Sequence, residues 1–141
     1  MSTVFTKIID GTLPGRLVWS DDVAVGFLSI NPLGPGHTLV VPRAEVDHWV
    51  EADAGLVSHL TDVAQTIGAA VHTVWQPPRV GLMVAGFEVP HLHLHVFPAW
   101  NMEAFDFANA AKSVDAAEQE GHRDALRAAL RDAGHGAHVP D

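Results

Sequence analysis

Three histidines alternate with apolar residues in the segment His91-Leu92-His93-Leu94-His95-Val96-Phe97. Successive side chains of a β-strand point to opposite faces, so this spacing predicts three imidazoles on one face and an apolar core face on the other. Imidazole changes its charge near neutral pH, and a row of such rings gains nothing from burial in an apolar core. This segment is therefore the part of the sequence most typical of a functional site.

Three interpretations of the histidine row are open from the residues alone. One is an exposed polar strand without a function, which would rarely consist of histidine throughout. Another is a zinc site, in which two imidazoles bind the metal and Glu88 or His37 supplies a third ligand. The last is catalysis on an anionic substrate, in which a neutral ring attacks phosphorus while flanking imidazolium groups neutralise phosphate and protonate the leaving group. The mechanism favours this last interpretation.

The elements that must position this strand show both helical and strand periodicity. A short helix with Val4, Phe5, Ile8 and Ile9 comes first and is followed by strands at 16–20, 23–28 and 37–42. A long helix from Asp53 to Trp75 comes next, and then strands at 79–84 and 92–98 and a helix at 114–132. The connections are too short for parallel crossovers, so the pattern predicts an α+β fold with an antiparallel sheet. Residues 134–141 are expected to be a frayed tail, in which His135 and His138 have no function.

The composition is that of one globular domain spanning residues 1–141. Of its 141 residues, 48% are apolar and 18% are charged. The net charge of −9 argues against binding to nucleic acid or to an anionic membrane. Cysteine is absent from the sequence, which excludes disulfides and thiolate metal sites. No secretion signal or membrane-spanning run is apparent, so a cytoplasmic location is expected.

The histidine segment and three other blocks together resemble the histidine triad (HIT) family of nucleotide hydrolases and transferases. The other blocks are Phe5-Thr-Lys-Ile-Ile9, Phe27-Leu-Ser-Ile-Asn-Pro32 and Gly36-His37-Thr-Leu-Val-Val-Pro-Arg43, in the order typical of the family. The resemblance covers residues 3–98, and residues 101–141 are expected to form a C-terminal helical extension. It implies a five-stranded antiparallel sheet with one long central helix, a short N-terminal helix and a C-terminal helix, and a homodimer.

The resemblance also implies a purine nucleotide as substrate and a role for each site residue. By its position, His93 is the nucleophile that attacks the α-phosphorus and carries the nucleotide until water removes it. The backbone carbonyl of His91 would accept a hydrogen bond from the His93 ring. His95 would lie at the leaving group, and His37 would face the phosphate. The residues expected around the nucleoside are Val4, Phe5, Ile8, Phe27, Ile30 and Leu39 at the base, with Ser29 (often an aspartate in the family) or Asn31 at the ribose.

Several positions depart from the family pattern. Ala85 stands where an asparagine is common, Phe87 replaces a glutamine, and Glu88 occupies the place of a hydroxyl residue that contacts phosphate. A carboxylate beside phosphate costs about 1–4 kcal/mol at 4 Å, so Glu88 turns away, pairs with a histidine, or selects a less anionic substrate. Members of the family with a structural zinc use an N-terminal cysteine pair. Thr3 and Thr6 occupy those positions, so no metal and no other cofactor is expected.

Together these features predict a hydrolase that cleaves nucleoside 5′-phosphate derivatives, such as phosphoramidates or dinucleoside polyphosphates, through a nucleotidyl intermediate on His93. Two alternatives stay open. One is a nucleotide-binding or sensing protein whose altered phosphate loop has lost turnover, and the other is a zinc site on the histidine strand that is unrelated to nucleotides.

Overall fold

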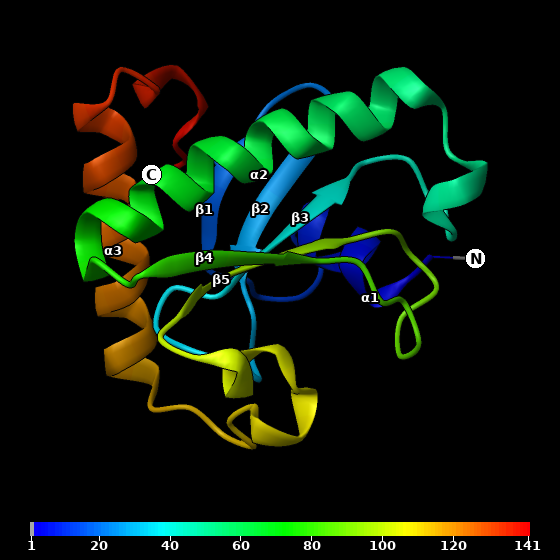
Figure 1. Ribbon diagram of the computed structural model, residues 1–141. Helices are drawn as coiled ribbons and strands as arrows, with labels where there is room; N and C mark the ends of the chain where they lie inside the picture. Colours follow the sequence, from blue (N-terminus) through cyan, green and yellow to red (C-terminus); the bar gives the residue numbers. More distant parts are fainter. Residues whose placement is uncertain (1) are drawn as a thin grey trace.

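The computed structural model of the protein describes residues 2–141, so Met1, where the predicted domain begins, lies outside the described residues. Within that part, five strands form one antiparallel sheet with three α-helices around it (Figure 1). The strand order is β1-β2-β3-β5-β4, with β1 and β4 at the two edges. This arrangement confirms the predicted α+β fold with its five-stranded antiparallel sheet.

The helices and strands follow the predicted order with small shifts at their ends. The elements are α1 (Val4–Ile9), β1 (Leu17–Ser20), β2 (Ala24–Leu28), β3 (Thr38–Pro42), α2 (Ala54–Trp75), β4 (Arg79–Met83), β5 (Leu94–Ala99) and α3 (Ala116–Asp132). Four short 3-10 turns complete the described chain: η1 (Trp49–Glu51), η2 (Met102–Phe105), η3 (Phe107–Asn109) and η4 (Gly136–His138). No helix within residues 2–141 is both long and apolar enough to cross a membrane.

Helix α2 lies across one face of the sheet (Figure 1). The Asp53 side chain begins it by accepting a hydrogen bond from the Gly55 N–H, as expected of an N-cap residue. Its buried stripe includes Leu60, Ile67 and Val71, which recur at helical spacing and pack against the sheet. The helix ends at Gln76, whose φ of 50° is left-handed, immediately before two prolines.

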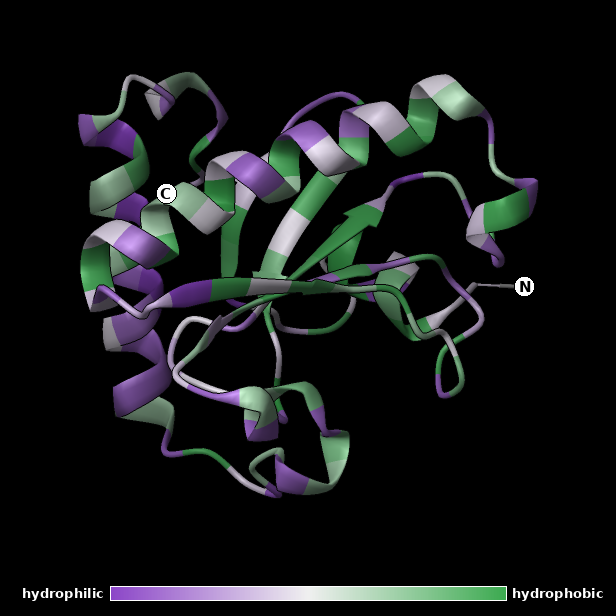
Figure 2. Cartoon of the chain, in the orientation of Figure 1, coloured by the Kyte–Doolittle hydropathy of each residue, from purple (hydrophilic) through white to green (hydrophobic). Residues whose placement is uncertain are grey.

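The two faces of the sheet bury different sets of side chains, because residues alternate along each strand. Leu92, Leu94 and Val96 belong to the core beneath α2, as predicted for the apolar positions between the histidines. On the opposite face a smaller cluster forms around α1; its buried members are Phe5, Val25, Phe27, Leu39 and Val41. Figure 2 shows hydrophobic residues on the strands beneath α2 and mostly hydrophilic residues along α3. The second face remains open enough to hold a cleft.

A turn-rich loop at residues 31–36 leads into β3 and places His37 at its start. Gly36 has a φ of 76°, and a Cβ at this position would collide with the ring of Trp75 at the end of α2. Only glycine meets both requirements, since it tolerates a positive φ and has no side chain. The loop and the helix end can therefore pack closely behind His37.

The C-terminal segment packs on the protein, so the prediction of a frayed tail is wrong. The ring of His138, in η4, stacks on Trp19 with a centroid distance of 4.9 Å and an interplanar angle of 30°. His135 contacts the same indole at 5.8 Å, and Val139 packs against the core beneath α2. These contacts join residues far apart in the sequence, and burying the aromatic faces favours an ordered segment.

Candidate active site

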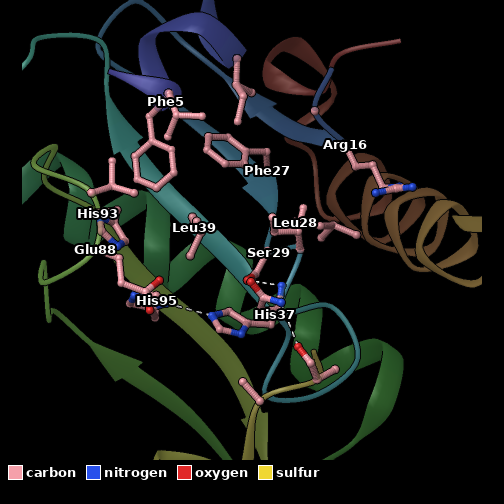
Figure 3. A pocket seen from close by; sticks show the side chains of 18 of the residues that line it. Phe5, Arg16, Phe27, Leu28, Ser29, His37, Leu39, Glu88, His93 and His95 are labelled. Atoms are coloured by element: carbon pink, nitrogen blue, oxygen red, sulfur yellow. Dashed lines mark hydrogen bonds between the residues drawn. The ribbon is translucent and has the colours of Figure 1, made fainter. Parts of the chain in front are cut away.

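A cleft with a volume of about 830 Å³ opens on the sheet face that carries Phe5, Phe27 and Leu39 (Figure 3). Twelve residues expected around the substrate line it: Val4, Phe5, Ile8, Phe27, Ser29, Ile30, Asn31, His37, Leu39, Glu88, His93 and His95. Phe5 lies against Phe27 at 5.5 Å and against the His93 ring at 4.9 Å, both in edge-to-face arrangements. The apolar end of the cleft therefore adjoins the histidines directly.

His91 lies on the same side of the sheet as His93 and His95, as predicted, but its ring packs against Phe5 at 5.8 Å and is absent from the cleft lining. Strand β5 begins only at Leu94, yet the two-residue alternation extends back to His91, because Leu92 belongs to the core beneath α2. The His91 ring is fully buried, with Nε2 2.7 Å from the Pro42 carbonyl oxygen and Nδ1 2.6 Å from Thr3 Oγ1. Burial of this ring is tolerated because both of its nitrogens are hydrogen-bonded, a possibility that the sequence argument overlooked.

The backbone fixes the proton on the His93 ring. Its Nδ1 lies 2.7 Å from the His91 carbonyl oxygen, which can only accept a hydrogen bond. Nδ1 must therefore carry the proton, and Nε2 of the neutral ring keeps its lone pair. The position expected to supply the nucleophile thus has the tautomer that a nitrogen nucleophile needs.

A second chain of hydrogen bonds fixes the protons of His37 and His95. The Leu33 N–H donates to His37 Nδ1 at 2.9 Å, so the proton of the neutral His37 ring resides on Nε2. This Nε2–H donates in turn to His95 Nδ1 at 3.0 Å, as drawn in Figure 3. The proton of neutral His95 therefore resides on Nε2, and the cleft receives an N–H donor from this residue.

All three rings that line the cleft are held neutral. Burial lowers the pKa of His37 to about 3 and that of His95 to about 4, and each is lowered further by neighbouring imidazoles. Burial also lowers the pKa of His93, although its hydrogen bond to His91 and the charge of Glu88 oppose the shift. Desolvation therefore disfavours the charged form of each ring in the free protein, which argues against the expected imidazolium groups.

The His91 ring is tied to helix α1 through a polar network. Thr3 caps α1, accepting a hydrogen bond from the Thr6 N–H, and its hydroxyl donates to His91 Nδ1. The Thr6 hydroxyl and the Thr3 N–H both donate to Oε1 of Glu45. Thr3 and Thr6 stand where zinc-containing relatives are expected to have cysteines, and the network contains no thiolate. These residues do not fit a structural zinc site, since their polar atoms already form hydrogen bonds within this network.

The other metal hypothesis also lacks ligands. Throughout residues 2–141, no group of three or more His, Asp or Glu side chains has the arrangement needed to hold a metal ion. His91 uses both of its ring nitrogens in hydrogen bonds and is therefore not available as a ligand.

The segment before the histidines places a carboxylate at the cleft. Glu88 lines the cleft near His93 and His95 (Figure 3), and its charge acts to raise the pKa of His93. No ion pair within the described residues engages it. Ala85 and Phe87 also line the cleft, Phe87 with 97% exposure, but neither side chain carries the amide expected at these positions. Glu88 thus lines the cleft without an ion pair to a histidine, and its effect on the choice of substrate stays a prediction.

The segment after β5 forms a wall of the cleft that the sequence did not predict. Phe107, on η3, contacts His95 with a ring-centroid distance of 5.0 Å. The segment is anchored to the loop before β3, because Asn31 Nδ2 donates to the Ala111 carbonyl and the Ala111 N–H donates to Pro32. The missed lining residues from this side are Phe107, Ala108, Ala110, Ala111, Lys112, Glu120 and Arg123. A 3-10 turn has no long apolar periodicity, so the sequence carries little signal for it.

Three of the protein's eight Lys and Arg residues line this cleft, although the net charge is −9. These residues are Arg16, Lys112 and Arg123, and they lie around the Ser29–Asn31 segment. The Arg16 carbonyl accepts from the Leu28 N–H, and the Lys112 carbonyl accepts from Asn31. Figure 3 places Arg16 beyond Leu28, on the side away from Glu88. The cleft thus carries cationic side chains together with Glu120 of α3, and a second carboxylate, that of Glu88, near the histidines.

Comparison with known proteins identifies relatives across most of the chain. The model of the HIT domain matches residues 10–102. An uncharacterized HIT-like protein from Saccharolobus solfataricus is 31% identical over 105 residues, covering 71% of this chain and 76% of that protein. A protein from Arabidopsis thaliana named adenylylsulfatase HINT3 is 29% identical over 100 residues, covering 67% of this chain and 51% of its own.

The structural comparison extends over nearly the whole chain. The crystal structure of a zinc-bound histidine triad family protein from Mycobacterium smegmatis superimposes with a TM-score of 0.81 at 27% identity, covering 96% of this chain and 98% of that one. This coverage includes most of the region that follows β5. Because the domain model covers more than half of the sequence and the first relative exceeds 30% identity, the chain belongs to the histidine triad (HIT) family.

Proposed function

We propose that the protein is a cytoplasmic hydrolase of nucleoside 5′-phosphate derivatives that works through a nucleotidyl intermediate on His93. The observation that carries the proposal is the 2.7 Å hydrogen bond from His93 Nδ1 to the His91 carbonyl oxygen. It leaves Nε2 unprotonated, beside a cleft with an apolar end. A neutral imidazole so oriented is a competent nucleophile toward phosphorus at neutral pH.

The reaction takes place in two displacements at the α-phosphorus. First, the His93 Nε2 lone pair forms a bond to phosphorus, and the bond from phosphorus to the leaving group breaks, with its electron pair going to the leaving group. Water then attacks the same phosphorus, the P–N bond breaks, and its electron pair returns to Nε2. The products are a nucleoside 5′-monophosphate and the free leaving group, and the proton of water passes to solvent.

The two ends of the cleft suit the two parts of a purine nucleotide. The base would lie among the apolar side chains, and the ribose would contact Ser29 or Asn31. The expected apolar contacts are Val4, Phe5, Ile8, Phe27, Ile30 and Leu39, all of which line the cleft. Phosphoramidates and dinucleoside polyphosphates are the substrate classes proposed here. One relative bears the name adenylylsulfatase, which supports hydrolysis at a nucleotide.

A homodimer is part of the proposal. Strand β4 is an edge strand, and edge strands offer unpaired backbone groups to another chain. Leu82 and Val84 at this edge are 51% and 40% exposed, and Trp100 nearby is 52% exposed. If pairing occurs at this edge, Leu82→Lys should convert a dimer to a monomer in analytical ultracentrifugation.

Trapping of the intermediate tests whether the protein is a hydrolase that carries the nucleotide on His93. The wild-type protein is mixed with adenosine 5′-phosphoramidate or diadenosine polyphosphate, quenched without acid and weighed by mass spectrometry. A gain of one nucleotidyl group is expected in the wild type and in the control His72→Ala, which alters an exposed ring on α2. His93→Ala should show no gain and a fall in kcat of at least about a thousandfold, as for removal of other catalytic nucleophiles.

A nucleotide sensor is the competing function, and the replacements Ala85, Phe87 and Glu88 in the phosphate loop favour it. The same experiment separates the two. A sensor would bind adenosine 5′-monophosphate in calorimetry yet show neither labelling of His93 nor turnover. Normal turnover by His93→Ala would contradict the assignment of the nucleophile itself.

A further inference from the structure

The part of the cleft around residues 29–31, here called the ribose end, holds cations that the proposed reaction does not use. The further inference concerns this end and rests on the proposed function, which assigns the ribose to it. Although the net charge is −9, three cationic side chains line the cleft here: Arg16, Lys112 and Arg123. Attack at phosphorus takes place beside His93, so hydrolysis at the 5′ position gives these cations no role.

Two of the cations are brought to Ser29 by hydrogen bonds between distant segments. The Arg16 carbonyl accepts from the Leu28 N–H at 3.0 Å, so Arg16 lies beside the strand residue that precedes Ser29. Beyond Ser29, Asn31 Nδ2 donates to the Lys112 carbonyl at 3.4 Å. Figure 3 shows Leu28 and Ser29 between Arg16 and the histidines. Arg16 and Lys112 therefore reach the ribose end from two separate parts of the chain.

Helix α3 brings the third cation to the same place. Gln119 Nε2 donates to the Ser29 carbonyl at 3.0 Å, and Arg123 follows one helical turn later. Asp124 bonds Arg123 at Nε only, which leaves both Nη groups of the guanidinium for a ligand. Glu120 of α3 is the one carboxylate that lines this end within the described residues. Cations therefore outnumber carboxylates at the ribose end.

The Arg16 side chain is half-buried and has no protein partner within residues 2–141. Every other arginine side chain donates a hydrogen bond to a backbone or side-chain oxygen. The ammonium group of Lys112 likewise forms no ion pair in the described part of the chain. Both groups bind phosphate through charge-assisted hydrogen bonds, and a guanidinium can donate two in parallel. An unpartnered guanidinium at the cleft is therefore available to an anionic ligand.

Ser29 adds a hydroxyl donor at the ribose end. Its Oγ accepts a hydrogen bond from the Asn31 N–H at 3.1 Å, so the hydroxyl hydrogen is available to the cleft that the residue lines. Phosphate oxygens accept such a hydrogen bond, whereas a carboxylate at the same position would repel them. The ribose end thus combines cations with a neutral donor, which is the complement of a phosphate group.

We propose that the protein prefers nucleotides that carry a second phosphate on the ribose, at the 2′ or the 3′ hydroxyl. This phosphate binds the guanidinium groups of Arg16 and Arg123 and accepts a hydrogen bond from the Ser29 hydroxyl, while Lys112 balances its remaining charge. No bond to the ribose phosphate forms or breaks. It fixes the nucleotide in the cleft, and His93 attacks the phosphorus at the 5′ position as before.

Calorimetry with four adenosine nucleotides tests the proposal on the wild-type protein. The 5′-monophosphate is the reference, the 2′,5′- and 3′,5′-bisphosphates carry the added phosphate on the ribose, and the 5′-diphosphate carries it at the histidine end. One bisphosphate should bind at least about tenfold more tightly than both the monophosphate and the diphosphate, the gain typical of a charge-assisted hydrogen bond. The tighter of the two identifies the hydroxyl that carries the phosphate.

Two results of this titration would overturn the inference. One is that neither bisphosphate binds more tightly than the monophosphate. The other is that the diphosphate gains as much affinity as the bisphosphates, because the gain would then reflect charge alone and not its position on the ribose.

The variant Arg16→Gln tests where the ribose phosphate binds. It should lower the ratio of bisphosphate to monophosphate affinity by about tenfold. Arg131→Gln is the matched control, because it removes the same charge from α3 outside the cleft lining, and it should keep the ratio within about twofold. An unchanged ratio in Arg16→Gln would contradict the proposed site. The Arg16 side chain makes no hydrogen bond within residues 2–141, so its loss should not unfold the protein.

Failure of this inference can be distinguished from failure of the proposed function. If none of the four nucleotides binds, both are wrong. If the monophosphate binds and His93 is labelled by adenosine 5′-phosphoramidate, but neither bisphosphate gains affinity, only the inference about the ribose phosphate is wrong. The kinetic counterpart is a ribose-phosphorylated adenosine 5′-phosphoramidate, for which kcat/KM should exceed that of the unmodified compound by about tenfold. An equal kcat/KM for the two compounds would count against the inference.

Discussion

The molecule contains two groups of imidazole rings that differ in what surrounds each nitrogen. In the cleft, His37, His93 and His95 each have one nitrogen fixed by a hydrogen bond that traces back to the backbone. Around Trp19, the rings of His135 and His138 are held mainly by face-to-face and tilted contacts with the indole. Clusters of the same residue type can therefore serve chemistry in one place and packing in the other.

The two groups differ in whether a ring presents a nitrogen of defined protonation state to the cleft. A backbone carbonyl or N–H cannot change its role, so a ring bonded to it keeps one tautomer and presents a defined atom to a substrate. His59, near Trp19, instead bonds the carboxylate of Asp21 at 2.9 Å. Hydrogen bonds from Trp19, Val23, Ala24 and His59 bring the pKa of that carboxyl down to about 2 in spite of partial burial. The ionised carboxylate can only accept a hydrogen bond, so Nε2 of His59 also carries a proton, but none of the rings around Trp19 lines the cleft.

The largest effect expected from this comparison is a loss of stability in mild acid through the cleft rings. In the unfolded chain both His37 and His95 titrate near pH 6.5, whereas their folded pKa values are about 3 and about 4. The unfolded state therefore binds more protons below pH 6.5, and the free energy of unfolding should decrease as the pH falls. Each ring contributes a slope of up to about 1.4 kcal/mol per pH unit.

Urea unfolding between pH 6.5 and pH 5 measures this slope in a range where Asp21 stays ionised in both states. His37→Gln removes one of the cleft rings whose pKa is lowered and should give a shallower slope, while His138→Ala should leave the slope unchanged. If His37→Gln and wild type had the same slope, the neutral state of the cleft rings would not be the source of the pH dependence.

A smaller effect is expected from Thr3→Val, which breaks the link between helix α1 and the histidine segment. The variant loses the cap of α1 and the hydroxyl donor to His91 Nδ1, so it should lose about 1–3 kcal/mol of unfolding free energy. kcat should also fall, because His91 carries the carbonyl that orients His93. Thr3→Ser keeps the hydroxyl and should restore both. A Ser variant as impaired as the Val variant would show that the hydroxyl is not what matters.

The sequence predicted the elements well where the signal is local. The stripe of α2 repeats over many residues, Asp53 and the prolines after Trp75 mark its ends, and the alternation of Leu94, His95 and Val96 gives the correct faces of β5. The alternation also gives the correct side of the sheet for His91, but it could not show that the ring is buried against Phe5 and Thr3 at helix α1.

The parts that could not be predicted depend on contacts between distant segments. Phe107 reaches His95 because the chain after β5 is anchored to Asn31, and no local pattern reveals that hydrogen bond. Likewise, stacking on Trp19 orders the C-terminal segment. The neutral state of the cleft histidines also follows from burial, which the sequence could not supply. The family resemblance pointed to the residues around the cleft and to the hydrogen bond from His93 to the His91 carbonyl, but it could not give the protons on His37 and His95.

Replacement of Glu88 should have an effect on specificity of about tenfold. Its carboxylate lies at the histidine end of the cleft, so Glu88→Ser should raise kcat/KM for dinucleoside polyphosphates by about tenfold, the equivalent of about 1.4 kcal/mol of repulsion. Glu120→Gln neutralises a carboxylate that also lines the cleft, on α3, and should change this ratio far less. Unchanged kinetics in Glu88→Ser would show that the charge of Glu88 does not determine substrate specificity.

The smallest effect is expected at the second imidazole cluster, where His138→Ala removes one stacked ring. Loss of the contact with Trp19 should lower the unfolding free energy by about 0.5–1.5 kcal/mol, the range typical of aromatic pairs. The cleft lies elsewhere, so kcat and KM should stay within about twofold of wild type. His138→Phe keeps an aromatic ring and should recover most of the stability. Urea unfolding measures the first quantity and steady-state kinetics the second. A large loss of activity in His138→Ala would mean that the C-terminal segment influences the cleft, and the separation between the chemical and the packing cluster would be wrong.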